Sequence, residues 1–101
     1  MEPIFHITDA AQWYEAAAMG VYTGSTRGKT LDEVGFIHCS FQHQVEPTAK
    51  LIYGDATEEL VLLTIDQSLV TAPIKLEADF PHIYGILTTD AVTAVEPLRV
   101  A

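Results

Sequence analysis

Hydrophobic and polar residues alternate along several short stretches of the chain, which is the pattern of half-buried strands. Residues 59–65 differ because their apolar run is almost unbroken, as is typical of a central strand covered on both faces. The other predicted strands cover residues 3–7, 35–40, 74–77, 82–87 and 92–95. Short strands separated by turn residues predict a small, mostly antiparallel sheet.

Two longer helices are predicted between these strands. Residues 10–19 are rich in alanine, follow polar capping residues and stop before Gly20, a residue well suited to a helix end. Residues 45–53 form the second helix, with Pro47 in its first turn, where no amide donor is lost. The expected fold class is therefore α+β, with the sheet packed against two main helices.

The segment between the two helices is predicted to be irregular. Residues 21–29 contain glycine and serine typical of turns. A capping-box pattern begins at Thr30, but Gly35 leaves room for only about one helical turn. No repeat or linker interrupts the sequence, so we expect a single domain over residues 1–101.

The amino-acid composition limits both the structural class of the protein and the molecules that it can bind. Hydrophobic residues make up 49% and charged residues 19%, which predicts a globular chain rather than a disordered one. Fourteen acidic residues against five basic ones give a net charge of -9, which would repel nucleic acid and anionic membranes, so neither is expected as a partner. One cysteine excludes an internal disulfide, and with no basic signal region or long apolar run we expect a cytoplasmic protein.

The most informative chemical pattern is a histidine placed between two apolar residues. It occurs at His6, His38 and His82. Side chains alternate between the faces of a strand, so apolar neighbours that enter the core would place each histidine on the opposite face. If the three strands are neighbours, their imidazoles converge, and the same phase adds Ser40 and Tyr84. The sequence therefore predicts a small-molecule cleft with a few polar groups between aromatic walls.

Two other interpretations of the histidines compete with this one. Each histidine taken alone is more simply a polar residue on a solvent-facing strand. Three imidazoles with an open position would also suit a catalytic zinc ion. No CxxC, HExxH or paired ligand spacing supports zinc, so no metal ligand is assigned. Cys39 is expected in the core as a small apolar residue, and His43 is expected at the surface.

A glycine-containing segment supplies the only dense positive charge. Residues 23–30 nearly match a phosphate-binding loop, but Thr23 replaces the first glycine and the flanking elements are wrong, which excludes an NTPase. A solvated loop is the simpler interpretation. Ser25, Arg27 and Lys29 nevertheless form a region that could hold an anionic group, so Ser25 and Arg27 are assigned to the mouth of the cleft.

Two sequence blocks carry a family resemblance. They are Gly-Phe-Ile-His-Cys-Ser at residues 35–40 and Phe-Pro-His-Ile-Tyr-Gly at residues 80–85. Further matching positions are His6, Trp13, Tyr22, Gly24, Ser25, Gln44, Ile65, Asp66 and Glu77. Together they resemble, over almost the whole chain, the small bacterial domains called domain of unknown function 952. The resemblance implies an ADP-ribosyltransferase-like fold, a small bent sheet split into two halves.

The implied fold also implies a class of ligand. ADP-ribosyltransferase-like enzymes hold NAD between the sheet halves, where an early histidine binds a ribose, an aromatic ring stacks on the nicotinamide and a late glutamate or histidine assists. By this resemblance His6 or His38 takes the first role, Tyr84 the second, and Glu77 or His82 the third.

These lines lead to one functional hypothesis and one alternative. We expect a histidine-lined cleft that binds or acts on a nucleotide-like, NAD-like or phosphorylated small molecule, with His38, His82 and Glu77 as catalytic residues. The expected substrate-binding residues are His6, Ser25, Arg27, Ser40 and Tyr84. An enzyme of this kind would be a transferase or hydrolase acting on an ADP-ribose or NAD-like ligand. The alternative is a non-catalytic module that senses a ligand in the cleft or docks a protein partner through exposed aromatic rings.

Overall fold

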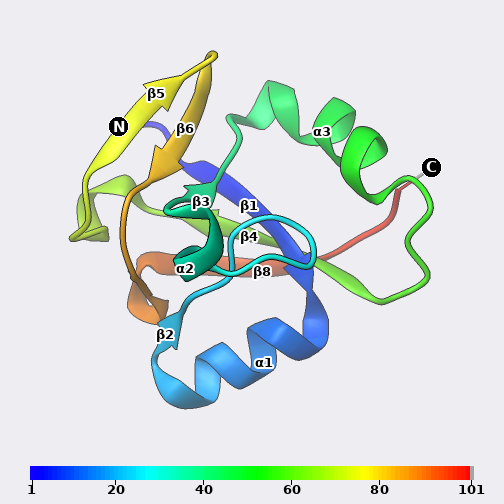
Figure 1. Cartoon of the computed structure of the whole chain (residues 1–101), viewed down its shortest axis with the longest axis horizontal. Coiled ribbons are helices and arrows are strands. Elements are labelled where there is room, and N and C mark those ends of the chain that lie inside the picture. The colour runs from blue at the N-terminus through cyan, green and yellow to red at the C-terminus, as the bar shows by residue number, and fades with distance from the viewer. Residues whose placement is uncertain (101) are drawn as a thin grey trace.

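The computed structural model describes residues 1–100 and confirms an α+β fold with small antiparallel sheets (Figure 1). The strands are β1 (Ile4–Asp9), β2 (Val21–Tyr22), β3 (Ile37–His38), β4 (Leu60–Ile65), β5 (Ile74–Glu77), β6 (Phe80–Ile83), β7 (Leu87–Thr88) and β8 (Val92–Leu98). The helices are α1 (Ala10–Met19), α2 (Leu31–Val34) and α3 (Val45–Tyr53), with short 3-10 turns at Gln42–Gln44, Gln67–Leu69 and Thr89–Ala91. No helix in this described part of the chain is long and apolar enough to cross a membrane.

The strands are divided between two three-stranded antiparallel sheets and one short pair. The first sheet has the order β1-β4-β8, the second has the order β3-β6-β5, and β2 pairs with β7. The central position predicted for residues 59–65 is confirmed, because β4 lies between β1 and β8. The two larger sheets join where Phe5 of β1 and Ser40, just after β3, exchange backbone N–H···O bonds of 2.8 Å in both directions.

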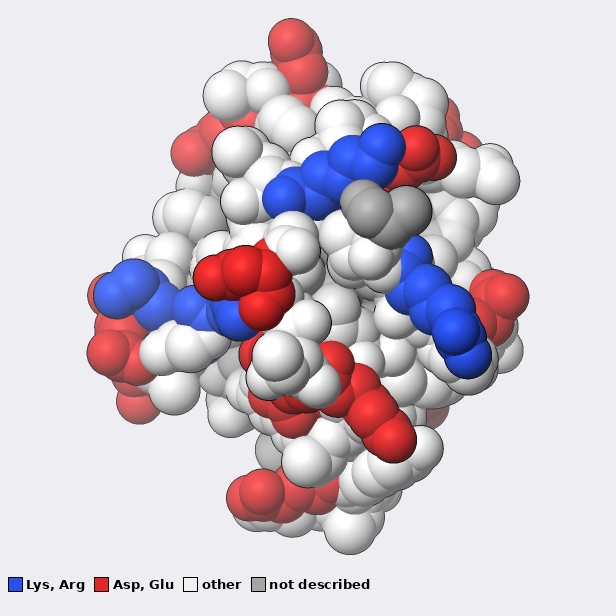
Figure 2. Space-filling model, turned by 90° about the vertical axis from the view of Figure 1, so that its right-hand side faces the viewer, with Lys and Arg blue, Asp and Glu red and all other residues white. Residues whose placement is uncertain are grey.

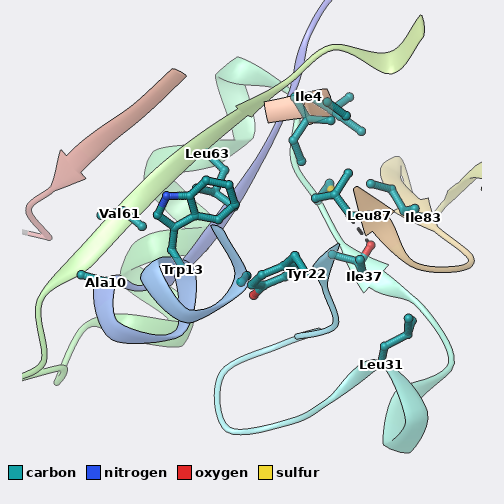
Figure 3. Close-up of a cluster of buried hydrophobic side chains, with 14 residues drawn as sticks. Ile4, Ala10, Trp13, Tyr22, Leu31, Ile37, Val61, Leu63, Ile83 and Leu87 are labelled. Carbon is teal, nitrogen blue, oxygen red and sulfur yellow. Dashed lines mark hydrogen bonds between the residues drawn. The ribbon is translucent and has the colours of Figure 1, made fainter. Parts of the chain in front are cut away.

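Helix α1 forms where its caps predicted it. The Asp9 carboxylate accepts a hydrogen bond of 2.8 Å from the Gln12 amide, and Gly20 ends the helix in the left-handed conformation. The helix buries Trp13 against one face of the β1-β4-β8 sheet, where Leu63 belongs to the same core cluster (Figure 3). Local capping and burial of one apolar face therefore agree on the same helix.

Helix α3 covers the opposite face of that sheet. Its predicted range, residues 45–53, is confirmed, and its buried Ala49 and Tyr53 form a second cluster with Ile7 and Leu60. Figure 1 shows α1 and α3 on opposite sides of the β1-β4-β8 sheet. Because helices pack on both faces, β1 and β4 are mostly buried, whereas the edge strand β8 stays mostly exposed.

Two expected elements differ from the structure. The continuous strand predicted for residues 82–87 is wrong, because β6 ends at Ile83 and the chain then passes very close to Ala72. A Cβ at Gly85 would lie only 2.8 Å from the Ala72 Cβ, so the bend needs glycine. The predicted loop at residues 21–29 begins instead with β2, which pairs with β7 after this bend.

The close packing around Gly24 yields a test of the fold. A Cβ at Gly24 would lie 2.5 Å from Gln12 Nε2 and would overlap the buried Tyr22 hydroxyl. We expect G24A to lower the free energy of unfolding by about 2 kcal/mol in urea denaturation, because overpacking strains a filled core. The control is G28A, where space is open and only the left-handed backbone at φ 72 is penalised. A G24A variant as stable as the wild type would contradict this packing.

Candidate functional site

His38 and His82 lie directly opposite each other on two neighbouring strands. Their Cα atoms are register partners in the antiparallel β3-β6 pair, and their ring centroids are 5.2 Å apart. The predicted alternation holds on β3, because Ile37 is 0% and Cys39 1% exposed and both point away from the histidine. Cys39 is therefore a core residue as expected, and burial raises the pKa of its thiol.

Hydrogen bonds orient this histidine pair. His82 Nδ1 lies 2.8 Å from the Phe80 carbonyl oxygen, and since a carbonyl only accepts, Nδ1 carries the proton. The other ring nitrogen of His82, Nε2, lies 3.4 Å from His38 Nδ1, and when Nε2 carries no proton it accepts a long hydrogen bond from His38 Nδ1. His38 Nε2 is then unprotonated and has no hydrogen-bond partner within residues 1–100. The strand pair thus presents one oriented basic nitrogen.

The surroundings of His38 favour its neutral form. Partial burial lowers the pKa of its imidazole below the ordinary value, and the nearby His82 lowers it further. At neutral pH the ring is therefore a base that is ready to accept a proton, rather than a cation.

His6 occupies a different environment from the other two histidines. It is only 3% exposed, its Nδ1–H donates a hydrogen bond of 2.6 Å to the His38 carbonyl oxygen, and its Nε2 accepts one of 2.8 Å from the Tyr22 hydroxyl. Burial lowers the pKa of His6 to about 4. The expectation that His6 points away from the core is wrong, because Tyr22 of β2 and the backbone of β3 pack against its ring.

A small cavity lies where β1, β3, α3 and the loop before α2 meet. Its polar lining includes His6, Ser25, Thr26, Arg27, His38, Ser40 and Thr48. The free volume that a water-sized molecule can reach inside is about 20 Å³, room for one water molecule. Ser25 is buried there and donates its hydroxyl to the Phe36 carbonyl. The structure therefore brings five of the expected site residues to one cavity beside the join of the two sheets.

The remaining expected site residues lie outside this cavity. His82 contacts His38 but does not line the cavity. The Tyr84 hydroxyl donates a hydrogen bond to the Glu77 carboxylate, and this bond raises the pKa of Tyr84. Glu77 is thus placed against a phenol and not against an imidazole. Phe36 joins the two groups, with its ring centroid 4.6 Å from that of His82 and 5.6 Å from that of Tyr84.

No group of three or more His, Cys, Asp or Glu side chains within residues 1–100 is arranged to hold a metal ion. His38 and His82 are the only imidazoles of the described chain whose rings face each other across a strand pair. Their ring nitrogens lie within hydrogen-bond distance of each other, and His82 also bonds to a backbone carbonyl.

Comparison with known proteins places the chain in a family. The family model described as "Protein of unknown function (DUF952)" matches residues 7–95. The chain belongs to this family. A search of curated proteins found no match.

The chain is also similar to a protein whose structure has been solved. It is 32% identical to CC0527 from Caulobacter crescentus, whose X-ray structure superimposes with a TM-score of 0.81 over 98% of this chain and 88% of that one. The X-ray structure of a double mutant of CC0527 gives the same values. The solution NMR structure of CC0527 gives 33% identity and a TM-score of 0.78 over 100% of this chain and 88% of that one.

Sequence reasoning missed the contribution of α3 to the cavity. Thr48, Ile52 and Tyr53 line it from this helix. Thr48 and Ile52 are four residues apart and therefore share one helix face, a signal that was present in the sequence. Which face meets the histidine strands depends on the packing of α3 across the first sheet, which the sequence pattern does not specify.

The buried His6 makes a prediction about stability and pH. Its folded pKa of about 4 lies below the unfolded value of 6.5, so the unfolded chain binds more protons between these values. The free energy of unfolding should fall by about 3 kcal/mol on this account as the pH drops from 6.5 to 4. In H6N the amide keeps a donor for the His38 carbonyl but does not titrate, so urea denaturation should show a flatter pH dependence. If the free energy of unfolding changed with pH equally in H6N and the wild type, the lowered pKa of His6 would be contradicted.

The histidine pair makes a second prediction. Because His82 lowers the pKa of His38, H82Q should raise the pKa of His38, as measured by NMR titration of its ring. The exposed His43 serves as the internal reference, and its titration should be the same in both proteins. An unchanged His38 titration would mean that the two rings do not interact.

Proposed function

We propose that the chain binds a small phosphorylated, nucleotide-like ligand at this cavity and that His38 acts on it as a general base. The observation that carries the proposal is the hydrogen-bonded series from the Phe80 carbonyl through His82 to His38, which leaves His38 Nε2 without a partner among residues 1–100 on a residue that lines the cavity. A neutral imidazole that is oriented in this way suits proton transfer near neutral pH.

The other polar groups at the cavity support an anionic ligand. Arg27 lines it and carries a guanidinium whose planar donors match phosphate or carboxylate oxygens. Thr26 of the same loop also lines it and adds a hydroxyl. Because the whole chain has a net charge of -9, such a ligand would be held by this local group and not attracted by the overall field.

The architecture supports the nucleotide-like part of the proposal. The sheets divide into two halves that join at Phe5 and Ser40, and the cavity lies beside this join. This is the feature expected of an ADP-ribosyltransferase-like fold, so NAD and ADP-ribose are the first ligands to test. An enzyme with this site would be a transferase or a hydrolase, and Tyr84 and Glu77 would act on the part of the ligand that lies outside the cavity.

A docking role is the second candidate, favoured by one observation. The rings of Phe36 and Tyr84 are partly exposed on the β3-β6-β5 sheet and do not line the cavity. An aromatic surface of this kind is typical of protein contacts. In that case ligand additions would leave the cavity residues unaffected.

The proposed function predicts the outcome of a thermal-shift and NMR screen. NAD or ADP-ribose at about 100 times its dissociation constant should add about 2.7 kcal/mol to the free energy of unfolding. H38A should remove this stabilisation while the folded spectrum is retained, because it deletes the free ring nitrogen. The matched control is H43A, which removes an exposed histidine away from the cavity and should bind like the wild type. Equal binding by H38A and the wild type would contradict the assignment.

A further inference from the structure

The loop that forms one wall of the cavity is a small closed hairpin, here called the flap and defined as residues 23–30. Gly24 and Thr30 pair at its base. Within it, the Ser25 amide donates to the Lys29 carbonyl at 3.1 Å, and the Lys29 amide donates to the Thr26 carbonyl at 2.8 Å. The flap is therefore held together internally, so it can move as one unit about its base.

A single side chain fastens the tip of the flap to α3. Arg27 Nη1 donates to the Ile52 carbonyl at 2.9 Å and to Asp55 Oδ1 at 2.6 Å, and Nη2 lies 3.6 Å from Glu58 Oε1. The guanidinium also lies over the Tyr53 ring, 5.3 Å from its centroid. Figure 2 looks onto the end of the molecule where α3 finishes, and basic and acidic side chains lie against each other there.

The same two elements determine the size of the cavity. Thr26 and Arg27 of the flap form one side, and Ile52 and Tyr53 of α3 form the other. With the tip fastened, the reachable volume is about 20 Å³, too small for a phosphate group. Entry of a phosphorylated ligand therefore requires the flap to move away from α3.

From these contacts we propose that Asp55 and Glu58 are internal competitors for Arg27 and that an anionic ligand group displaces them to open the cavity. This inference rests on the proposed function and deepens it. The Asp55 side chain is 87% exposed while that of Arg27 is 32% exposed, so solvent reaches the carboxylate and exchange of one anion for another is feasible. The bond from Arg27 to the Ile52 carbonyl must also break when the flap moves away from α3, and the incoming anion compensates the guanidinium for the loss of these contacts.

The arrangement also specifies the chemical class of the group. Two carboxylates from different residues face the two terminal nitrogens of one guanidinium. A single group that replaces both must carry two charged oxygens in a fixed geometry, which a phosphate or diphosphate does. A monocarboxylate can also contact both nitrogens, but it replaces two negative charges with one, whereas a phosphate or diphosphate carries about two. The site is therefore inferred to select phosphate groups over carboxylates.

The test removes the competitors and keeps Arg27. D55N/E58Q should bind inorganic pyrophosphate about tenfold more tightly than the wild type in an NMR titration, and acetate should gain much less. Hydrogen exchange at the Ser25 and Lys29 amides should become faster in D55N/E58Q without any ligand, because the two carboxylate contacts of the tip are lost and only the Ile52 and Tyr53 contacts of Arg27 remain. The charge-matched control is E15Q/E46Q, which removes two exposed acidic groups on α1 and α3 and should resemble the wild type.

A third variant identifies the residue responsible. Adding R27Q to D55N/E58Q should abolish the gain in pyrophosphate affinity, because the competitors act only through the guanidinium. Unchanged or weaker pyrophosphate binding by D55N/E58Q would overturn the inference, as would an equal gain in E15Q/E46Q. Failure of the proposed function would be a separate result. In that case H38A would bind ADP-ribose as tightly as the wild type, while D55N/E58Q would still bind pyrophosphate more tightly.

Discussion

The join between the two halves of the sheet is the constraint on which the site depends. Phe5 and Ser40 exchange backbone hydrogen bonds there, and the buried His6 next to Phe5 donates to the His38 carbonyl. One imidazole ring thereby links β1 to β3 and, through the Tyr22 hydroxyl, to β2. A charged ring could not accept the Tyr22 bond, so the link requires a neutral histidine, and burial keeps it neutral.

Two neutral histidines of the same chain therefore have different roles. Both nitrogens of His6 are used by the protein, which makes its ring a structural connection. His38 uses one nitrogen to bond His82 and retains the other. The carbonyl that His6 binds belongs to His38 itself, so the structural ring fixes the backbone of the residue that presents the free nitrogen. Arg27 lines the same cavity, and its guanidinium is paired with the Asp55 carboxylate. The cavity therefore combines the neutral imidazole of His38 with a cation that already has an anionic partner.

Local signals predicted all three helices, two of them from caps formed by neighbouring residues and α3 from the proline in its first turn. The helices at residues 10–19 and 45–53 and the single turn after Thr30 are confirmed, because capping and apolar periodicity act over a few residues. The continuous strand over residues 82–87 failed for the opposite reason. Its break is imposed by the approach of Gly85 to Ala72, a contact between segments that the alternation pattern does not contain.

The sequence by itself determined which residues alternate with the core, and for β3 this was enough to predict on which side His38 lies. Only the tertiary structure decided that His38 and His82 are register partners, that Tyr22 and the β3 backbone enclose His6, and that α3 completes the cavity. The physical reason is that a strand has two faces of fixed period, whereas what covers each face depends on segments that are distant in the chain.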